Sequence, residues 1–497
     1  MTSSILAMSS MSNQAVEPEI VASSVPKPER VLDGFPWVSA IIVYTLSWGW
    51  SLLRPNTLYW EDWIVLQYKI KTLYGDPSHL GLSPWTVLLK SNTSTLYETF
   101  LTFGGFFVSG IFLFVILAKF KQVDLFSKRA AVLLFLITPV NHARVVELIF
   151  FYQVSYFLFF LGWVIIVRSQ KAWSFSLALV AIFLSFQTES LLFFVLLPFM
   201  NFLWQNKVHL FSGQRVRKYR IMTLCFAVLP VLYFVLERKF WPVKDTNYRS
   251  LSVSGFIIGF IPIFIATVLL VLVVLKYRKT KTVNTGFALA AGGLWIAALA
   301  LFPYFFNGSI SGYGSRTAYV TVFEFRASWR SRHLLLVPLG ISLTIVGLNQ
   351  LWNPKNRNYL LKFVLMSSVL LNIFFGSQYF LQSHKQEQLV ALFKTTKNEI
   401  VIASVSDKTI RFMGRGAEFF KFEWIGLMNL AGVPVNLAGV PENSDGIPID
   451  SSGCEALPKG SALTLNSDTS YLKALITRDL GLYFDVTPCS EVLAKDG

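Results

Sequence analysis

The sequence predicts a helical membrane protein, with about eleven transmembrane helices in one bundle and a small α/β domain after them. Composition is the first reason, since 54% of the 497 residues are hydrophobic and 14% are charged. In soluble proteins about 25% are charged. The second reason is a series of apolar runs of about 20 residues, long enough to cross a hydrocarbon layer of about 30 Å as helices. Because lipid offers the backbone no hydrogen-bond partner, these runs are expected to form a helical bundle.

Short polar or basic loops separate the predicted spans. The third run is too short to cross alone, and its end at Thr138-Pro139 predicts a helix that stops within the bundle. We expect this break to expose Asn141 and His142 to a protein-lined cavity. The runs cover residues 36–53, 96–118, 130–140, 145–167, 172–186, 190–204, 221–236, 254–275, 285–305, 334–348 and 359–380.

The distribution of basic residues predicts the orientation. Cytoplasmic loops retain Lys and Arg, and with the N-terminus inside, the five inner loops hold 17 of them in 46 positions, against 13 in about 92 outer positions. An odd number of spans then places residues 381–497 outside the cytoplasm. The expected location is a bacterial inner membrane, while periplasm, cell exterior and organelle lumen stay open for the outer side.

The chain divides into three predicted regions. Residues 1–33 are small, polar and Pro-containing, which predicts a disordered cytoplasmic tail rather than a cleaved signal peptide. Residues 34–380 form the transmembrane module. Residues 381–497 hold 14 of the 28 acidic residues and a strand-like run at 399–405, and they predict a soluble α/β domain. Cys454 and Cys489 both lie in this region, and it stays open whether they form a disulfide. The net charge of +16 does not indicate nucleic-acid binding, because Lys and Arg lie between apolar runs.

Four groups of polar residues fall on the predicted outer face. Ionisable residues at membrane depth are costly and indicate function. The orientation rests on basic-residue density, so the convergence of these groups is a separate observation. The groups are Glu61 and Asp62 between aromatic residues; Asn141, His142, Arg144 and Glu147 before the fourth span; Gln187, Thr188 and Glu189 after the fifth; and Arg326, Arg330, Arg332 and His333 before the tenth.

These groups have the parts for transfer from a phosphate leaving group. A carboxylate can deprotonate an attacking hydroxyl, and guanidinium groups can bind a phosphate through two parallel hydrogen bonds. Structural interpretations stay open for each group. Glu61 and Asp62 would be solvated acids in an aromatic belt, and the basic residues at 326–333 would be interfacial anchors. His142 and Glu147 would belong to a capped helix start, and Glu189 to a buried structural pair.

In this order the motifs resemble those of the C-type (GT-C) glycosyltransferases, multispan enzymes that use polyprenyl- or dolichyl-phosphate sugars, and in particular their protein O-mannosyltransferase-like members. The resemblance covers residues 51–351. Glu61-Asp62 resembles the paired acids of the family's first outer loop, and 138–147 resembles its Pro-x-His segment followed by a glutamate. Residues 186–189 resemble a Ser-Lys-Glu turn but lack its basic residue, and Ser331-Arg332-His333 resembles the late basic motif.

The resemblance implies a GT-C-like bundle and inverting transfer of a sugar from a lipid phosphate to an extracytoplasmic glycan, lipid or protein acceptor. One of Glu61 and Asp62 would act as base and the other would orient a substrate or a metal. A possible divalent cation stays open, because adjacent acids are an incomplete ligand set. The implied substrate-binding residues are His142, Glu147, Glu189, Arg326, Arg330, Arg332 and His333.

Two other functions stay open. A glycolipid flippase or transporter would also need a polar outer cavity, but transporters often show inverted repeats and charges near the membrane midplane. An O-antigen polymerase or ligase is a glycosyl-transferring membrane protein that relies on outer-loop arginines and a histidine without the early acid pair.

Overall fold

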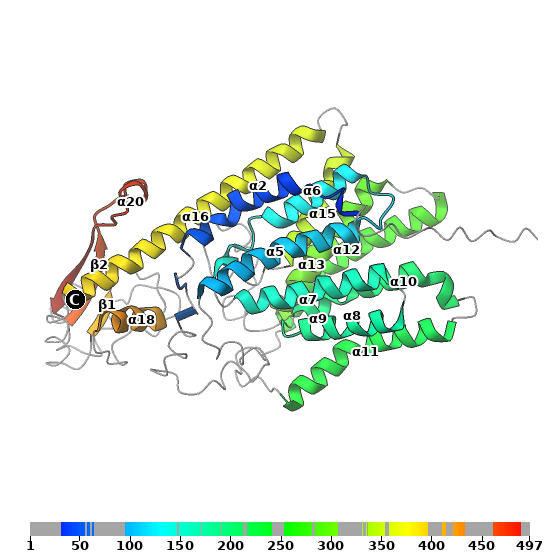
Figure 1. The fold of residues 1–497 in the computed structure, drawn as a ribbon, viewed down its shortest axis with the longest axis horizontal. Coiled ribbons are helices and arrows are strands. Elements are labelled where there is room, and N and C mark those ends of the chain that lie inside the picture. The colour runs from blue at the N-terminus through cyan, green and yellow to red at the C-terminus, as the bar shows by residue number, and fades with distance from the viewer. Residues whose placement is uncertain are drawn as a thin grey trace, which may run out of the picture.

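The computed structural model is mostly helical, and its long helices lie side by side along one axis (Figure 1). The residues that it describes are 31–54, 57–59, 62–63, 95–146, 149–169, 171–188, 190–211, 216–240, 253–280, 284–306, 331, 334, 336–352, 357–395, 410–413, 421–432 and 461–488.

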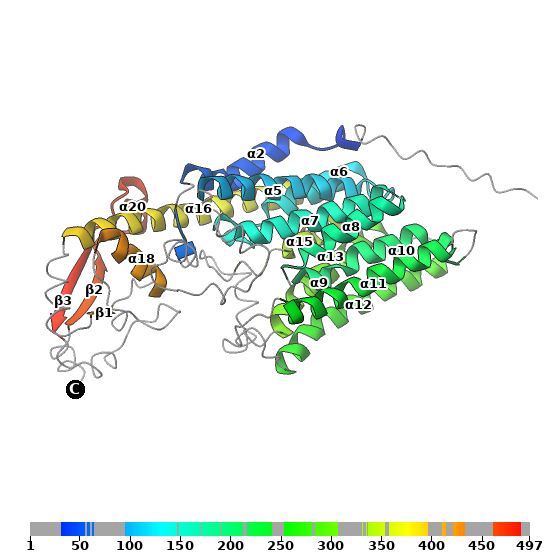
Figure 2. The same ribbon diagram turned by 60° about the horizontal axis from the view of Figure 1, so that its bottom comes forward.

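The helices of the bundle lie along this axis and mostly alternate in direction (Figures 1 and 2). The α-helices are α2 (Trp37–Trp48), α5 (Thr95–Leu117), α6 (Leu125–Ile137), α7 (Ile149–Arg168), α8 (Ala172–Ser185), α9 (Ser190–Phe194), α10 (Leu196–Phe211), α11 (Val216–Phe240), α12 (Val253–Thr280), α13 (Thr285–Phe306), α15 (Val337–Leu351) and α16 (Arg357–Thr395). Of these, α9 and α10 follow one another in the same direction. Two short 3-10 helices interrupt the series: η1 (Gly49–Leu53) follows α2, and η3 (His142–Val145) follows α6.

Six helices among the described residues are long and apolar enough to cross a membrane: Tyr97–Leu117, Ile149–Arg168, Val216–Phe240, Gly255–Lys276, Thr285–Pro303 and Tyr359–Thr395. The clearest is α12, which is apolar all round, as expected of a membrane span, and presents exposed Phe260, Ile261 and Phe264. In water such a surface would be a large apolar patch. These helices indicate a multi-pass membrane protein, while the count of eleven spans stays a prediction.

Helix α6 stops inside the bundle, as the Thr138-Pro139 boundary predicts. Its first turn is capped by Asp124, whose carboxylate accepts a hydrogen bond from the backbone of Ser127 at 2.9 Å, and it ends at Ile137 after 13 residues. Asn141 and His142 follow, but their exposed fractions are 0% and 1%. They are therefore packed within the protein, and the protein-lined cavity that is expected beside them stays a prediction.

Helices α13 and α15 approach closely through small residues. A side chain at Gly340 would overlap with Ala297, and one at Gly347 would overlap with the backbone of Ala290. Small residues at such positions let two membrane helices bring their backbones together, which gains dispersion contacts where lipid provides no hydrophobic driving force.

Helix α16 extends beyond the apolar run that predicts it. It has 39 residues, which corresponds to a length of about 58 Å at 1.5 Å per residue, so it exceeds a hydrocarbon layer of about 30 Å. The helix passes through residue 381, the predicted start of the soluble region, and continues to Thr395. The domain boundary stays a prediction.

The C-terminal elements surround the far end of α16, at the opposite end of the bundle from the start of α2 (Figures 1 and 2). Strand β2 (Ser461–Ser467) pairs parallel to β1 (Ile410–Met413) and antiparallel to β3 (Leu482–Pro488). Helices α18 (Lys421–Ala431) and α20 (Tyr471–Thr477) lie beside them. The predicted strand at 399–405 and both Cys454 and Cys489 lie outside the described residues, so a separate α/β domain and its disulfide stay predictions.

Candidate functional site

Two of the predicted site residues, Asp62 and His142, belong to the part of the chain that the structure describes. The others lie outside the described residues: Glu61, Glu147, Glu189, Arg326, Arg330, Arg332 and His333.

Asp62 has a helical conformation directly after the loop that follows η1, and it is buried, with an exposed fraction of 0%. Its carboxylate Oδ2 accepts a hydrogen bond from the backbone N–H of Tyr59 at 3.1 Å. The backbone N–H of Asp62 in turn donates to the Tyr59 carbonyl at 3.1 Å. These two reciprocal bonds close a tight turn, and they hold the Asp62 side chain against its own loop.

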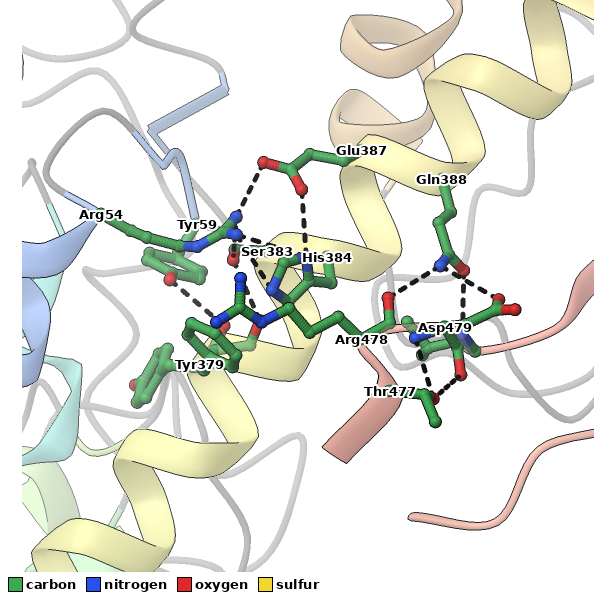
Figure 3. Close-up of polar contacts among 12 residues, drawn as sticks. Arg54, Tyr59, Tyr379, Ser383, His384, Glu387, Gln388, Thr477, Arg478 and Asp479 are labelled. Atoms are coloured by element: carbon green, nitrogen blue, oxygen red, sulfur yellow. Dashed lines mark hydrogen bonds and ion pairs between the residues drawn. The ribbon is translucent and has the colours of Figure 1, made fainter. Parts of the chain in front are cut away.

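The same loop is tied to α16. The Tyr59 hydroxyl donates to the carbonyl oxygen of Tyr379 at 3.3 Å, and Gln386 Nε2 donates to the carbonyl oxygen of Leu58 at 2.8 Å. Burial raises the pKa of the Tyr59 hydroxyl above its ordinary value, so this group stays protonated and keeps its donor. Figure 3 shows Tyr59 pointing toward Tyr379.

Helix α18 covers the other side of this loop. A side chain at Gly426 would overlap with the ring of Trp63, which directly follows Asp62. Glu423, three residues earlier and on the same face of α18, is fully buried. Because α18 packs on the first loop, it brings a second buried acid, Glu423, close to this loop. No motif in the sequence indicates this residue.

His142 lies in η3, at the turn where α6 ends. The Tyr379 hydroxyl donates to its carbonyl oxygen at 3.0 Å, and its ring stacks on Phe375, with ring centres 4.3 Å apart. Burial, and to a lesser extent the charge of Arg144, lower the pKa of His142 to about 3. The imidazole is neutral at physiological pH, so it can bind through a hydrogen bond but adds no positive charge for a phosphate.

Arg144 holds the η3 turn in place. Its guanidinium donates to the carbonyl oxygens of Asn141 at 3.0 Å and Leu136 at 3.2 Å. It also lies 4.0 Å from the ring centre of Trp48 and 4.9 Å from that of Phe106, a desolvated cation–π arrangement. Beside it is a cavity of about 10 Å³, enough for about one water molecule. This arginine is a structural element of the turn.

Ser331 brings a third segment to this turn. Its hydroxyl accepts a hydrogen bond from the backbone N–H of Ala143 at 2.8 Å. Ser331 is the first residue of the Ser-Arg-His motif, and Ala143 directly follows His142. Two motifs that are 188 positions apart in the sequence are thus joined by one buried hydrogen bond.

The turn before Glu189 packs against a different helix. Phe186 lies against Tyr233 of α11, with ring centres 5.6 Å apart, and α9 begins directly after Glu189. This ring contact is with α11, whereas the hydrogen bonds of Tyr59 and of the His142 carbonyl are with α16. The expected grouping of Glu189 with the other motifs stays a prediction.

An Arg-His-Glu network that no sequence motif indicates lies next to the first loop (Figure 3). Arg54 Nη1 donates to Glu387 Oε1 at 2.7 Å and to the Ser383 hydroxyl at 3.0 Å. Arg54 Nη2 lies 2.9 Å from His384 Nε2, and His384 Nδ1 lies 3.1 Å from Glu387 Oε2. The spacing of 383, 384 and 387 places the three α16 residues on one helix face; only the structure supplies Arg54.

The network continues into the C-terminal residues. Gln388 Nε2 donates to the carbonyl oxygen of Arg478 at 3.0 Å, and Gln388 Oε1 accepts from the N–H of Leu480 at 3.1 Å. Arg54 and Arg478 both approach the ring of Phe380, at 5.0 Å and 5.9 Å from its centre. One face of α16 therefore connects the end of η1 to the turn before β3.

The arrangement places the buried acids Asp62 and Glu423, the neutral imidazole of His142 and the start of a basic motif at one end of the bundle. Among the described residues there is no group of three His, Cys, Asp or Glu side chains that could hold a metal ion, and the possible divalent cation stays a prediction. No known family model, curated protein or solved structure matches the chain.

Proposed function

We propose that this protein is a multi-pass membrane glycosyltransferase, which moves a sugar from a polyprenyl-phosphate donor to an acceptor hydroxyl at the outer membrane face. The observation that supports it is the meeting of three motifs at η3. Tyr379 connects the loop of Asp62 to His142, and Ser331 connects the late basic motif to Ala143. An acidic, a histidine-containing and a basic segment that are connected in this way suit a reaction in which a carboxylate deprotonates the acceptor hydroxyl for attack on a lipid-linked phosphate sugar.

The two acids of the first loop have different roles in this proposal. One oxygen of Asp62 is already bound to the backbone of its own turn, which suits a residue that holds the loop and orients a substrate. Glu61 is then the base that deprotonates the acceptor hydroxyl. Arg330, Arg332 and His333 bind the donor phosphate and stabilise the charge that develops as the sugar leaves.

The proposed orientation places the site outside the cytoplasm. The start of α2 and the basic turn between α5 and α6 lie at one end of the bundle, and the C-terminal elements lie at the other (Figure 2). Because cytoplasmic loops retain Lys and Arg, the basic end faces the cytoplasm. Asp62, His142 and the far end of α16 then face the outer side, where lipid-linked sugars and their acceptors meet.

Transfer from a panel of radiolabelled polyprenyl-phosphate sugars, by the full chain in nanodiscs, tests the proposal. We expect Glu61→Gln to lower turnover by about 10²- to 10⁴-fold, as for the loss of a general base. Asp62→Asn is expected to raise KM more than it lowers kcat. Asp33→Asn is the matched control, because Asp33 is an exposed acid near the start of α2, and it should keep full activity.

Either of two results would overturn the proposal. One is turnover that is unchanged in monodisperse Glu61→Gln and Asp62→Asn variants. The other is no turnover of any donor by the wild type together with glycolipid movement across the bilayer, which would identify a transporter.

A further inference from the structure

A groove between α8 and α11 lies away from the proposed site. It has a volume of about 470 Å³, within the range of about 300–1,000 Å³ that is typical of small-molecule sites. Apolar side chains form its walls, and two basic side chains lie at one end. The residues that line it are Ala172, Phe175, Ser176, Leu179, Arg217, Lys218, Ile221, Met222 and Cys225.

The charge of this groove is segregated along its length. Arg217 and Lys218 belong to the first turn of α11, whereas Cys225 lies seven residues further along the helix than Lys218, which corresponds to about 11 Å. Helix α8 begins at the same level, and the exposed Lys171 directly precedes it. The groove therefore has a basic mouth at one membrane surface and an apolar interior that extends into the bundle.

The described lining contains two basic residues and no acidic residue. Arg217 makes no hydrogen bond or ion pair with the residues that the structure describes. Both helices also begin at the mouth, where the positive end of the helix dipole favours an anion. A second copy of the chain that docked through this face would bring equal positive charges together, so an anionic amphiphile fits the groove better.

We propose that this groove binds an anionic diacyl glycerophospholipid, with its phosphate at Arg217 and Lys218 and an acyl chain between α8 and α11. Basic pockets between transmembrane helices at the cytoplasmic surface are suited to anionic head groups. Each methylene group of the acyl chain that is buried in the groove strengthens binding through the hydrophobic effect. This lipid differs from the sugar donor, because it lies at the opposite end of the bundle from Asp62 and His142.

Protection of the Cys225 thiol tests the proposal, because this exposed cysteine lies in the groove. The full chain in a neutral detergent is alkylated with N-ethylmaleimide, and mass spectrometry of the Cys225 peptide gives its rate. We expect phosphatidylglycerol to slow the alkylation, and phosphatidylcholine to do so only at higher concentration. Glycerol phosphate, which has no acyl chain, should give no protection.

Variants identify the head-group contact. Arg217→Gln and Lys218→Gln are each expected to raise the phosphatidylglycerol concentration for half protection by about fivefold. Arg220→Gln is the matched control, because Arg220 is exposed on the same turn of α11 but does not line the groove, and it should behave as the wild type.

Three results would overturn the inference. They are equal protection by phosphatidylglycerol and phosphatidylcholine, protection by glycerol phosphate alone, or wild-type protection in both groove variants. Native mass spectrometry provides a readout that does not depend on the thiol. It should show a retained phosphatidylglycerol adduct on the wild type and on Arg220→Gln, and less of it on Arg217→Gln.

Discussion

The Tyr379 hydroxyl donates a hydrogen bond to the carbonyl oxygen of His142, 3.0 Å away, and the Tyr379 carbonyl accepts one from the Tyr59 hydroxyl. One residue of α16 therefore binds both the turn after α6 and the loop of Asp62. Because α16 also carries the contacts to Arg54 and to the C-terminal residues, a displacement of this helix would move the proposed acid and histidine segments together.

Replacement of Tyr379 by Phe removes the hydroxyl but keeps the ring. The buried His142 carbonyl then loses a donor, which costs about 0.5–1.5 kcal/mol, and the thermal midpoint in detergent should fall. The Tyr59 bond is kept, since it uses the Tyr379 backbone. Tyr59→Phe breaks the other of the two bonds that join the segments through Tyr379, so we expect both variants to lower kcat. An unchanged thermal midpoint would contradict the role of this hydrogen bond.

The buried His142 predicts a loss of stability in acid. Its pKa is lowered to about 3 in the folded chain, against about 6.5 when unfolded. The unfolded chain therefore binds more protons between these values. The contribution of neutral His142 to the free energy of unfolding is complete above about pH 6.5 and is lost as the pH falls toward 3. The free energy of unfolding then falls by at most about 1.4 kcal/mol per pH unit through this group.

Thermal unfolding of the wild type and His142→Gln, measured from pH 7.5 to pH 5, isolates this effect from that of other titrating groups. The wild type should lose more of its thermal midpoint over this interval than the variant does. Parallel pH profiles for the two proteins would show that His142 is already protonated in the folded state.

The end of α6 and the meeting of distant motifs show what the sequence could predict. Thr138-Pro139 cannot continue a helix, so the stop follows from local chemistry. The grouping of Asp62, His142 and Ser331 follows from counting spans, because motifs on the same side of a membrane meet at the same end of a bundle. The burial of Asn141 and His142 could not be predicted, since it depends on how α16 packs against the turn.

The length of α16 shows where hydropathy misleads. The apolar run ends near Phe380, but the next residues (LQSHKQEQLVALFK) include many good helix formers, such as Leu, Gln, Lys and Glu. The helix therefore continues to Thr395. Its polar face then pairs with Arg54, which comes from more than 300 positions earlier. A pattern read within one segment cannot find such a partner.

The Arg54 network is expected to contribute unequally. Glu387 is 62% exposed, and exposed ion pairs contribute about 0–1 kcal/mol, so Glu387→Gln should change the thermal midpoint little. Arg54→Gln should cost more, because it also removes the contact to the buried Ser383 and the cation over Phe380. Thermal unfolding of the two variants at low and high salt checks this order. A larger effect of Glu387→Gln would show that the ion pair dominates.

The close contact between α13 and α15 predicts different effects for two glycine replacements. A side chain at Gly347 would overlap with the backbone of Ala290, which cannot move aside without separating the helices, whereas one at Gly292 meets no atom within 4 Å. Gly347→Ala should therefore lower the thermal midpoint. Gly292→Ala should leave it unchanged or raise it, because Ala favours a helix by up to about 1 kcal/mol over Gly. Both variants add one methyl group to an apolar helix of the bundle, so their difference measures the packing of the α13–α15 interface. Equal effects would show that this interface tolerates a wider spacing.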